Sequence, residues 1–571
     1  MSYMEEYKFW LENVSESDKA ELESIKNDDN EIKERFYKSL EFGTAGLRGI
    51  IGIGLNRMNT YVVARATQGL ANQLIKTNPD RNDLKVTIAY DSRIKSDEFA
   101  KTAACVLAAN GIKAFIFEEL KPVPELSFSV RYKNADAGIA VTASHNPAKY
   151  NGYKAYGSDG CQMPPDAAKY IMSLMSKIDC FNDIKTVDFD KALSDGVIEY
   201  IEDWLIEEYL DEVEKQSVRD KNVDLSSLKI IYTPLHGTGN KPVRAILKRI
   251  GVNDVTIVKE QELPDGNFPT APYPNPEIKQ PFELALNLAK QNDADLLLAT
   301  DPDADRVGIA VKDGNEYTLV SGNDVGALLL NYILEMRIKN GTLPKNPIAI
   351  KTIVTTEVCQ KIADDYGCQL INVLTGFKFI GEQIALLEEK NEENRYILGY
   401  EESYGYLPGS YVRDKDAVVA SMLICEMAAY YKQKGLSLLD QLDFIFKKYG
   451  YFLNSQKSFA FEGQSGMETM KQIMNNLHIN PPAKIANSAV TIIEDYEKSL
   501  KTDLLNGSET KITLPKSNVV AFTLSDSSKV IFRPSGTEPK IKIYICACDS
   551  DKKVAAEKLS QLENTVAELL K

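Results

Sequence analysis

The segment that decides the fold spans residues 84–118 and reads LKVTIAYDSRIKSDEFAKTAACVLAANGIKAFIFE. Its first part, Leu84–Tyr90, is apolar and rich in β-branched residues, which predicts a strand. Ser96 then stands where a helix N-cap is expected, and the helix is predicted to end at Asn110, before a glycine. Ile112–Glu118 predicts a second strand, so the segment is a strand–helix–strand unit.

The same unit recurs twice. The predicted strands and helices are Lys229–Tyr232, Lys241–Ile250 and Val255–Lys259, and then Ile348–Val354, Glu357–Tyr366 and Leu370–Leu374. Strands that alternate with helices in this way indicate parallel α/β sheets. Ligands bind such open sheets beyond the carboxyl ends of the strands, so functional residues are expected in the loops there.

The C-terminal part has a different pattern. It predicts three closely spaced strands and a terminal helix, at Val519–Leu524, Lys529–Phe532, Lys540–Ala547 and Lys552–Leu570. The predicted fold is therefore α/β, with three similar α/β domains of mixed or parallel sheets and a smaller C-terminal α+β domain. We place these domains at residues 1–210, 211–322, 323–450 and 451–571.

Composition narrows the classes of function. A chain of 571 residues exceeds what one core supports, and 44% hydrophobic with 26% charged residues is typical of a globular protein. The net charge of −15 argues against nucleic acid as the main partner, because phosphate-backbone binding needs a basic face. A small anionic substrate remains compatible, since a few converging cations create a local positive pocket.

The sequence indicates neither a secreted nor a membrane-spanning protein. The N-terminal residues are polar and acidic, and no apolar run is long enough to span a bilayer. The eight cysteines are scattered, and the closest pair, Cys546 and Cys548, fits neither a redox nor a zinc motif. We therefore expect a cytoplasmic protein with reduced thiols.

The most specific loop is Thr142–Pro147, which reads TASHNP and follows the predicted strand Ala137–Val141. It presents the hydroxyl of Ser144 on a turn. A serine hydroxyl is a poor nucleophile alone, but it can carry a phosphoryl group when a base and a metal assist. The alternative interpretation is a polar turn that caps a helix.

A second loop carries Asp301, Asp303 and Asp305 after the predicted strand Leu296–Thr300. Alternating carboxylates supply the hard oxygen ligands that Mg²⁺ or Ca²⁺ requires. An EF-hand is excluded because its sixth and twelfth positions, which need Gly and Glu, hold arginine and lysine here. A solvated acidic turn remains the alternative.

Two further loops could bind a sugar phosphate. Arg533–Lys540 reads RPSGTEPK and holds the parts of a phosphate cradle, although it could be a plain turn between strands. Glu401–Gly405 follows the predicted strand Tyr396–Gly399 and could hold vicinal hydroxyls, or be an exposed acidic turn. The segments 43–49 (GTAGLRG) and 151–154 (NGYK) could support these loops.

Taken together, these loops resemble the α-D-phosphohexomutase family, which includes phosphoglucomutases and phosphomannomutases. The resemblance runs from about Phe42 to Lys540 with the motifs in family order, and TASHNP and RPSGTEPK are highly specific as a pair. It implies three α/β domains and a smaller fourth one around a central cleft. It also implies magnesium-dependent phosphoryl transfer through a phosphoserine and a sugar bisphosphate.

The resemblance implies a role for each candidate residue. Ser144 would be the phosphoserine, and Mg²⁺ would be held by its phosphate with Asp301, Asp303 and Asp305. Lys154, assisted by His145, would be the general acid/base, with its pKa lowered, and Arg48 and Arg306 would stabilise the transferring phosphoryl group. Sugar binding falls to Glu401 and Ser403, and Thr375, Gly376, Lys378 and Lys415 complete the substrate site. The other phosphate would bind Arg533, Ser535, Gly536 and Thr537.

The long N-terminal part resembles the subgroup of longer phosphoglucomutases and phosphopentomutases. We expect interconversion of glucose 1-phosphate and glucose 6-phosphate, with glucose 1,6-bisphosphate as intermediate and activator. Three positions depart from the family pattern: Tyr400 and Pro302 where Gly is common, and Tyr404 after the loop serine. The first touches the residues that read the sugar.

Several alternatives remain open. The substrate could be a mannose or pentose phosphate with the same mechanism, or the chain could be a sugar-phosphate phosphatase. A non-catalytic binding protein on the same fold is also possible, whereas a serine hydrolase lacks its Gly-x-Ser-x-Gly elbow. The expected partners are small sugar phosphates, without nucleic acid or membrane. The sequence leaves open whether the protein is a monomer or a dimer.

Overall fold

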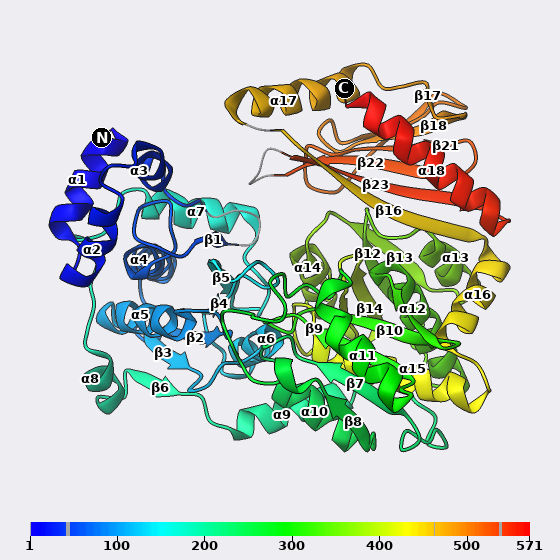
Figure 1. Ribbon diagram of the computed structural model, residues 1–571, viewed down its shortest axis with the longest axis horizontal. Helices are drawn as coiled ribbons and strands as arrows, with labels where there is room; N and C mark the ends of the chain where they lie inside the picture. Colours follow the sequence, from blue (N-terminus) through cyan, green and yellow to red (C-terminus); the bar gives the residue numbers. More distant parts are fainter. Residues whose placement is uncertain (1, 42–45, 462, 536–539, 571) are drawn as a thin grey trace. The chain divides into compact units, whose positions relative to one another are not determined.

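The computed structural model describes residues 2–41, 46–461, 463–535 and 540–570 (Figure 1). The chain divides into two compact units. Unit 1 comprises Met1–Val320, Gly381–Tyr396 and Tyr404–Gln433, and unit 2 comprises Ser321–Ile380, Ile397–Ser403 and Lys434–Lys571. Within the described residues, the strands form four main sheets. Over the same residues, no helix combines the length and the apolar character that crossing a bilayer requires.

The first sheet of unit 1 is mixed. Its order is β1 (Leu47–Ile50), β5 (Tyr150–Gly157), β4 (Ala137–Val141), β2 (Lys85–Tyr90), β3 (Lys113–Ile116) and β6 (Ile198–Tyr200). β2 pairs in parallel with β3 and β4, whereas β5 is antiparallel to β4 and β1. The helix between β2 and β3 is α5 (Ser96–Ala109), and it packs against both strands. The predicted strand–helix–strand unit is confirmed.

Ser96 is not the N-cap of α5. The cap position is Lys95, whose backbone is left-handed with φ of 64°, and no side chain caps the helix. The Ser96 hydroxyl instead donates to a carboxylate oxygen of Asp91 at 2.8 Å and accepts a bond from Asn151 at 3.0 Å. The buried carboxylate of Asp91 thus competes with the helix end for this hydroxyl, which the local sequence does not reveal.

The second sheet of unit 1 is also mixed. Its order is β11 (Glu316–Val320), β10 (Val307–Asp313), β9 (Leu296–Thr300), β7 (Lys229–Thr233) and β8 (Asp254–Ile257). β7 is parallel to β8 and β9, and β10 is antiparallel to β9 and β11. β9 is buried along its whole length and leads directly into the aspartate loop.

Helices cover these sheets. In unit 1 they are α1 (Tyr3–Asn13), α2 (Glu16–Ser24), α3 (Asp29–Phe36), α4 (Thr60–Thr77), α6 (Val123–Tyr132), α7 (Pro165–Met175), α8 (Phe189–Ser194), α9 (Trp204–Glu214), α10 (Asn240–Arg249), α11 (Glu283–Asn292) and α15 (Ala417–Gln433), with short 3₁₀ turns at Lys259–Gln261, Gln280–Phe282 and Glu393–Arg395. In unit 2 they are α12 (Gly322–Lys339), α13 (Val358–Asp365), α16 (Leu438–Tyr449), α17 (Gly463–Ile479) and α18 (Lys552–Leu569). α14 (Phe377–Glu388) and β14 (Tyr396–Glu401) each contribute residues to both units, and β15 (Gly405–Leu407) belongs to unit 1.

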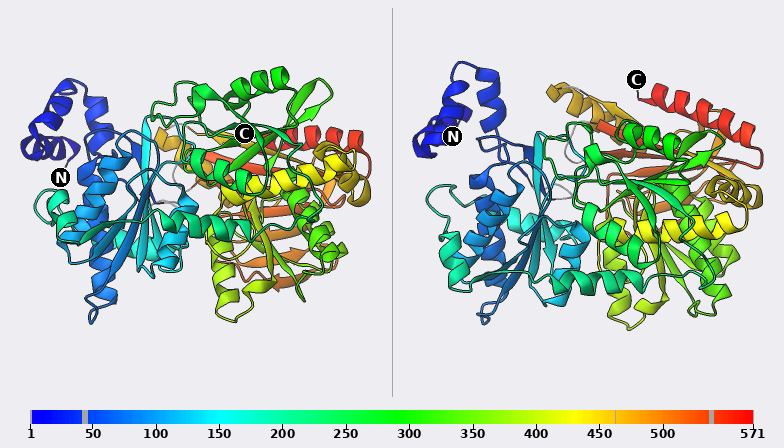
Figure 2. Two further views of the ribbon diagram at one scale, coloured as in Figure 1. Left: turned by 90° about the horizontal axis from the view of Figure 1, so that it is seen from below. Right: turned by 60° about the horizontal axis from the view of Figure 1, so that its bottom comes forward.

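Unit 2 contains the third strand–helix–strand unit and the C-terminal sheet. β12 (Ile348–Thr352) pairs in parallel with β13 (Gln369–Val373), as predicted. The C-terminal sheet has eight strands in the described residues: β16 (Tyr451–Ala460), β23 (Lys540–Asp549), β22 (Lys529–Pro534), β21 (Val520–Leu524), β18 (Ser488–Asp495), β19 (Leu500–Asp503) and β20 (Ser508–Lys511), with β17 (Lys484–Ile485) on β18. α18 lies along one face of this sheet (Figure 2).

The C-terminal α+β domain is confirmed, but it holds more strands than the three we predicted. The additional strands are only partly buried, and every residue of β20 is exposed. An exposed or half-buried strand lacks the continuous apolar run by which strands are recognised in a sequence. The ends of the four predicted domains stay a prediction, although each sheet falls within one of the predicted ranges.

A shared core and a buried charge cluster join the two sheets of unit 2. Ile353, Val354 and Leu374 pack in one cluster with residues of the C-terminal sheet such as Tyr496 and Ile531. The charge cluster centres on the carboxylate of Glu357, which lies 3.3 Å from the Lys351 ammonium and 3.4 Å from that of Lys529. Burial raises the pKa of Glu357, but these two ammonium groups outweigh burial and lower it to about 2.

The structure shows where the side chain of Tyr400 lies, at the position where glycine is common in the family. Its side chain is fully buried against α12, and its hydroxyl bonds to the thiol of Cys359. Successive side chains of a strand point to opposite faces, so Tyr400 and Glu401 diverge. A Cβ added to Gly326 of α12 would stand 2.2 Å from the Tyr400 ring. The tyrosine therefore fills the core and requires glycine at position 326.

We predict that Gly326→Ala destabilises the protein by about 1–2 kcal/mol, because overpacking against the ring outweighs the better helix propensity of alanine. Denaturant unfolding with a probe of unit 2 measures this. The double variant Gly326→Ala/Tyr400→Ala is the control, and it should lose less stability than the sum of the two single variants. Additive losses would contradict the proposed packing conflict.

Candidate active site

Ser144 lies in a strained turn directly after β4. Its backbone is left-handed, with φ of 50°, and Ala304 in the aspartate loop has φ of 48°. Such conformations cost free energy for residues other than glycine and concentrate at functional sites. The Ser144 side chain is nearly buried, and its hydroxyl donates to Oδ2 of Asp301 at 2.6 Å. Nδ1 of His145 lies 3.1 Å from the same hydroxyl oxygen.

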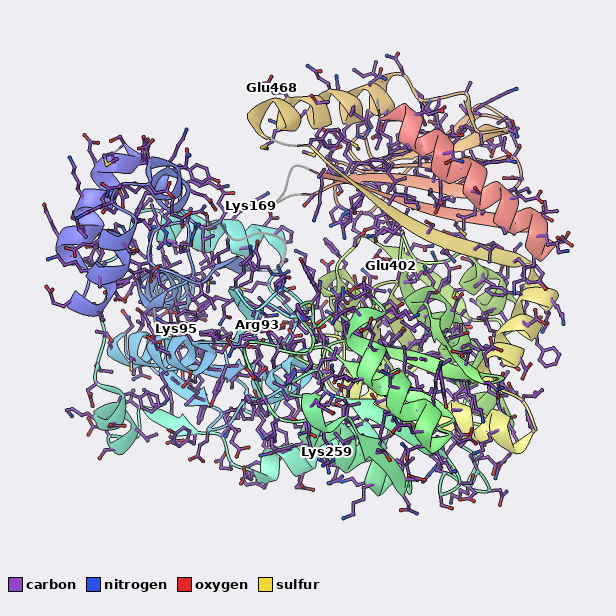
Figure 3. The ribbon with its side chains drawn as sticks, in the orientation of Figure 1. Arg93, Lys95, Lys169, Lys259, Glu402 and Glu468 are labelled. Atoms are coloured by element: carbon purple, nitrogen blue, oxygen red, sulfur yellow. The ribbon has the colours of Figure 1, made fainter. Side chains whose placement is uncertain are left out.

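Arg93, which is labelled in Figure 3, holds the backbone of this turn. Its guanidinium donates to four backbone carbonyls, those of Ser144, Asn146, Pro147 and Tyr150. It also lies over the ring of Phe268, 5.0 Å from the centroid. Sequence reasoning did not single out Arg93, although its place just beyond the carboxyl end of β2 is where functional residues of such sheets gather.

Asp91 and Thr142 complete the support of the serine turn. The Thr142 hydroxyl donates to Oδ2 of Asp91 at 2.6 Å and accepts the backbone N–H of Ser144 at 2.8 Å. Asp91 is also ion-paired with Arg93, with 3.3 Å between Oδ2 and Nε. Burial raises the pKa of Asp91 above its ordinary value, and the Arg93 charge and these hydrogen bonds oppose the rise.

The three predicted metal ligands are together and buried. One carboxylate oxygen each from Asp301, Asp303 and Asp305 lies within 4.8 Å of the others. Asp301 Oδ1 accepts the backbone N–H groups of Asp305 and Arg306, at 3.1 and 3.0 Å. Among the described residues, Oδ1 of Asp303 and Oδ1 of Asp305 are buried and accept no hydrogen bond. Orphaned carboxylate oxygens in such a cluster fit a hard divalent cation.

The three buried carboxylates repel one another unless positive charges lie beside them. Burial, with the charges of Asp303 and Asp305, raises the pKa of Asp301 well above its ordinary value. Burial also acts to raise the pKa of Asp305, but Lys415, Lys154 and Arg306 outweigh it and lower that pKa. The aspartate loop therefore depends on cations from other elements.

Lys154, on β5, is one of these cations. Its ammonium lies 2.8 Å from Asp303 Oδ2 and 3.5 Å from Asp305 Oδ2. Burial lowers the pKa of Lys154, but the two carboxylates outweigh burial, so the pKa is raised. This direction is opposite to the lowered pKa that we expected of a general acid/base.

Lys415 is the second cation. We expected it to complete the substrate site of the third domain, but its ammonium lies 3.1 Å from Asp305 Oδ2 and 3.0 Å from Asp414 Oδ1. Its hydrocarbon stem passes over Gly405, where a Cβ would stand 2.0 Å from the lysine Cδ. Glycine at this position thus lets the ammonium reach the aspartate loop.

Three other predicted residues lie around the serine turn and the aspartate loop. The exposed Arg48, on β1, donates to the side-chain oxygen of Asn146 at 3.0 Å. Arg306 pairs with Glu277, and its Nε lies 3.6 Å from Asp305 Oδ1. Burial, with the positive charges of Arg306 and Arg48, holds the pKa of His145 well below its ordinary value, so its imidazole is neutral.

The remaining predicted residues belong to unit 2. Glu401 accepts the backbone N–H of Gly376 at 2.9 Å, which brings two of the predicted sugar-binding loops together. The hydroxyl of Thr375 is buried and has no hydrogen-bond partner in the described residues. Lys378 is almost fully buried in the first turn of α14, and Ser403 is half-buried.

The predicted phosphate loop is described only in part. Arg533 donates to the hydroxyl of Tyr544 at 3.4 Å, and the backbone N–H of Ser535 donates to the carbonyl of Lys540 at 2.8 Å. Gly536 and Thr537 lie outside the described residues. Burial raises the pKa of Tyr544, and the negative charge of Glu402 raises it further.

Comparison with known proteins is consistent along the chain. Family models described as phosphoglucomutase/phosphomannomutase α/β/α domains I, II and III match residues 39–180, 207–314 and 321–449. A phosphoglucomutase of Staphylococcus saprophyticus is 37% identical over 537 residues, which cover 94% of this chain and 95% of the relative. One from Staphylococcus epidermidis is 38% identical over 534 residues, covering 93% and 94%.

Solved structures share the fold. Parafusin (pp63) from Paramecium, a phosphoglucomutase, matches with a TM-score of 0.69 at 19% identity, covering 93% of this chain and 94% of its own. A phosphoglucomutase/phosphomannomutase family protein from Burkholderia thailandensis matches with a TM-score of 0.66 at 16% identity, covering 93% and 96%. With the three domain matches, this confirms the predicted fold class.

We predict that Arg93→Lys loosens the serine turn, because a lysine keeps the charge but has no planar fork to reach several carbonyls. Losing even one charge-assisted hydrogen bond should speed amide hydrogen exchange of residues 143–150 about tenfold or more. Exchange in α5 should not change. The control is Arg81→Lys, at a more exposed arginine in the loop before β2. Unchanged exchange in the turn would exclude the role of Arg93.

We predict that Asp303→Asn weakens Mg²⁺ binding about tenfold or more, because it removes one charge from the buried cluster. Isothermal titration measures the affinity. Asp313→Asn, at an exposed aspartate at the end of β10, is the matched control and should bind Mg²⁺ like the unaltered protein. Equal affinities for both variants would mean that the cation binds elsewhere.

Proposed function

The chain belongs to the phosphoglucomutase/phosphomannomutase family, and from this premise we propose that it interconverts glucose 1-phosphate and glucose 6-phosphate through a phosphoserine at Ser144. The observation that carries the proposal is the 2.6 Å contact between the Ser144 hydroxyl and Asp301. It joins the hydroxyl proposed to carry the phosphoryl group to a carboxylate cluster suited to a divalent cation.

Asp301, Asp303 and Asp305 would hold Mg²⁺, together with an oxygen on Ser144. Bound there, Mg²⁺ would draw negative charge from the phosphoryl oxygens. Arg48 and Arg306 supply further positive charge for the transferring group, which phosphoryl transfer needs more than covalent assistance.

The reaction consists of two transfers. The phosphoserine P–O bond breaks as a sugar hydroxyl oxygen bonds to phosphorus, and the hydroxyl proton passes to a base of the protein. The product is glucose 1,6-bisphosphate, whose other phosphoryl group then returns to the Ser144 oxygen. Lys154 is the candidate proton carrier, because its side-chain nitrogen is buried beside Asp303 and Asp305; it would accept the hydroxyl proton as the neutral amine and return it as the ammonium. His145 assists as a neutral imidazole beside the serine oxygen.

Unit 2 would recognise the sugar and the phosphate that is not transferred. Glu401 and Ser403 are proposed to bind sugar hydroxyls, with Thr375, Gly376 and Lys378 beside them. Arg533, Ser535, Gly536 and Thr537 are proposed to bind the phosphate. The buried, unpartnered hydroxyl of Thr375 supports this assignment, because such groups are otherwise satisfied.

Glucose phosphate is the proposed substrate because relatives that cover nearly the whole chain are phosphoglucomutases. Tyr400, where the chain departs from the family pattern, is buried in the core against α12 and so does not argue against this substrate. A phosphomannomutase or phosphopentomutase with the same mechanism is the second candidate. We further propose glucose 1,6-bisphosphate as activator and a cytoplasmic location.

The test is to incubate the protein with Mg²⁺ and a trace of glucose 1,6-bisphosphate. The 1-phosphates of glucose, mannose and ribose are supplied separately, and ³¹P NMR follows the esters and free phosphate. We expect glucose 6-phosphate to form fastest. Ser144→Ala should lower the rate by at least about a thousandfold, because it removes the nucleophile. Ser173→Ala, at an exposed serine of α7, is the control and should keep full activity.

Faster conversion of mannose or ribose phosphate would keep the mechanism and replace the substrate. Accumulation of free phosphate in place of the isomeric ester would identify a phosphatase. Activity that survives Ser144→Ala would exclude the phosphoserine.

A further inference from the structure

Unit 1 contains a cavity of about 430 Å³ whose lining includes none of the residues assigned to catalysis or substrate binding. Its walls come from the segment after β3 that leads into α6, from the region of α9 and from α10. α9 packs against both α6 and α10 (Figure 1). The volume is within the range of cavities that bind small organic molecules.

One wall carries a buried carboxyl group, and one of its oxygens accepts no hydrogen bond within the described residues. Glu125, in the first turn of α6, lines the cavity and is 2% exposed. Its Oε2 is buried and makes no hydrogen bond to any described residue. Burial raises the pKa of Glu125 to about 7. Since buried polar groups in proteins are almost always paired, this carboxyl indicates a partner that enters from the cavity.

The charged side chains that line the cavity indicate whether its ligand is positively or negatively charged. Its lining holds five acidic side chains, Glu118, Glu119, Glu125, Asp203 and Glu207, against two lysines, Lys121 and Lys241. Lys241 is already ion-paired with Glu119. A phosphate or carboxylate ligand would meet a net negative surface, whereas a cation would be attracted.

A metal ion fits this cavity poorly. In the described part of the chain, only Asp301, Asp303 and Asp305 bring three possible ligand atoms close enough for one ion. The acidic groups that line the cavity do not form such a cluster. Its interior offers instead the buried apolar side chains of Phe117 and Leu210. Such a surface suits a hydrocarbon body.

We propose that this cavity is a binding site for a small organic amine, whose ammonium group pairs with Glu125 and whose apolar body lies against Phe117, Ile201 and Leu210. The site is independent of the proposed catalytic function. Its occupant would satisfy Oε2 of Glu125, which accepts no hydrogen bond from any described residue.

The test compares phenethylamine with 2-phenylethanol, which has the same apolar body but no charge. Isothermal titration or saturation-transfer NMR measures binding to the full chain. The amine should bind about tenfold tighter or more, and Glu125→Gln should remove that advantage, because a charge-assisted hydrogen bond is lost. Glu208→Gln, at an exposed glutamate of α9 outside the cavity, is the matched control and should bind the amine unchanged.

Ala245→Phe provides a second variant, because Ala245 lines the cavity from α10 and a phenyl ring would fill it. It should abolish amine binding, and it keeps the test valid if Glu125→Gln fails to fold. Three results would overturn the proposal: no saturable binding of phenethylamine, equal binding of the alcohol, or amine binding that survives both cavity variants.

Discussion

The charge balance of the aspartate loop is the constraint on which unit 1 depends. Three carboxylates are buried within 4.8 Å of one another, an arrangement that is costly unless positive charge stands beside it. That charge comes from distant parts of the chain, Lys154 on β5 and Lys415 before α15. Unit 1 therefore includes Tyr404–Gln433, although much of the intervening chain belongs to unit 2. α15, which lies in this segment, also packs against α10 and against the sheet that carries the aspartate loop.

The serine turn likewise has an unfavourable conformation that interactions with other residues hold in place. A left-handed serine would relax unless surrounding bonds over-determined it, and the guanidinium of Arg93 supplies four of them. A planar fork can serve several carbonyls at once, which an ammonium does not. Asp91 and Phe268 in turn hold the guanidinium by charge and by ring contact. The Ser144 hydroxyl therefore meets Asp301 in a prearranged geometry.

The sequence predicted what local pattern encodes. The strand–helix–strand units and the aspartate loop followed from apolar runs and residue spacing, and they are present in the structure. Ser96 was wrong as a cap because the buried carboxylate of Asp91, five residues earlier, takes its hydroxyl. Arg93 was missed because its partners are backbone carbonyls that only the fold assembles. The ion pair between Lys415 and Asp305 was not predicted, because position in the chain does not reveal which loop a long side chain reaches.

The residues with different proposed roles belong to different units of the chain. The groups proposed to carry the phosphoryl group and the metal belong to unit 1, and the groups proposed to read the sugar and the second phosphate belong to unit 2. Within unit 2, the hydrogen bond from Gly376 to Glu401 and the cluster around Glu357 hold the recognition residues to one core. Substitutions that retune the sugar can therefore accumulate in unit 2 without disturbing the charge balance of the aspartate loop. Under this proposed assignment, discrimination between sugars that differ in a single hydroxyl would rest on a few hydrogen bonds from unit 2 to that hydroxyl.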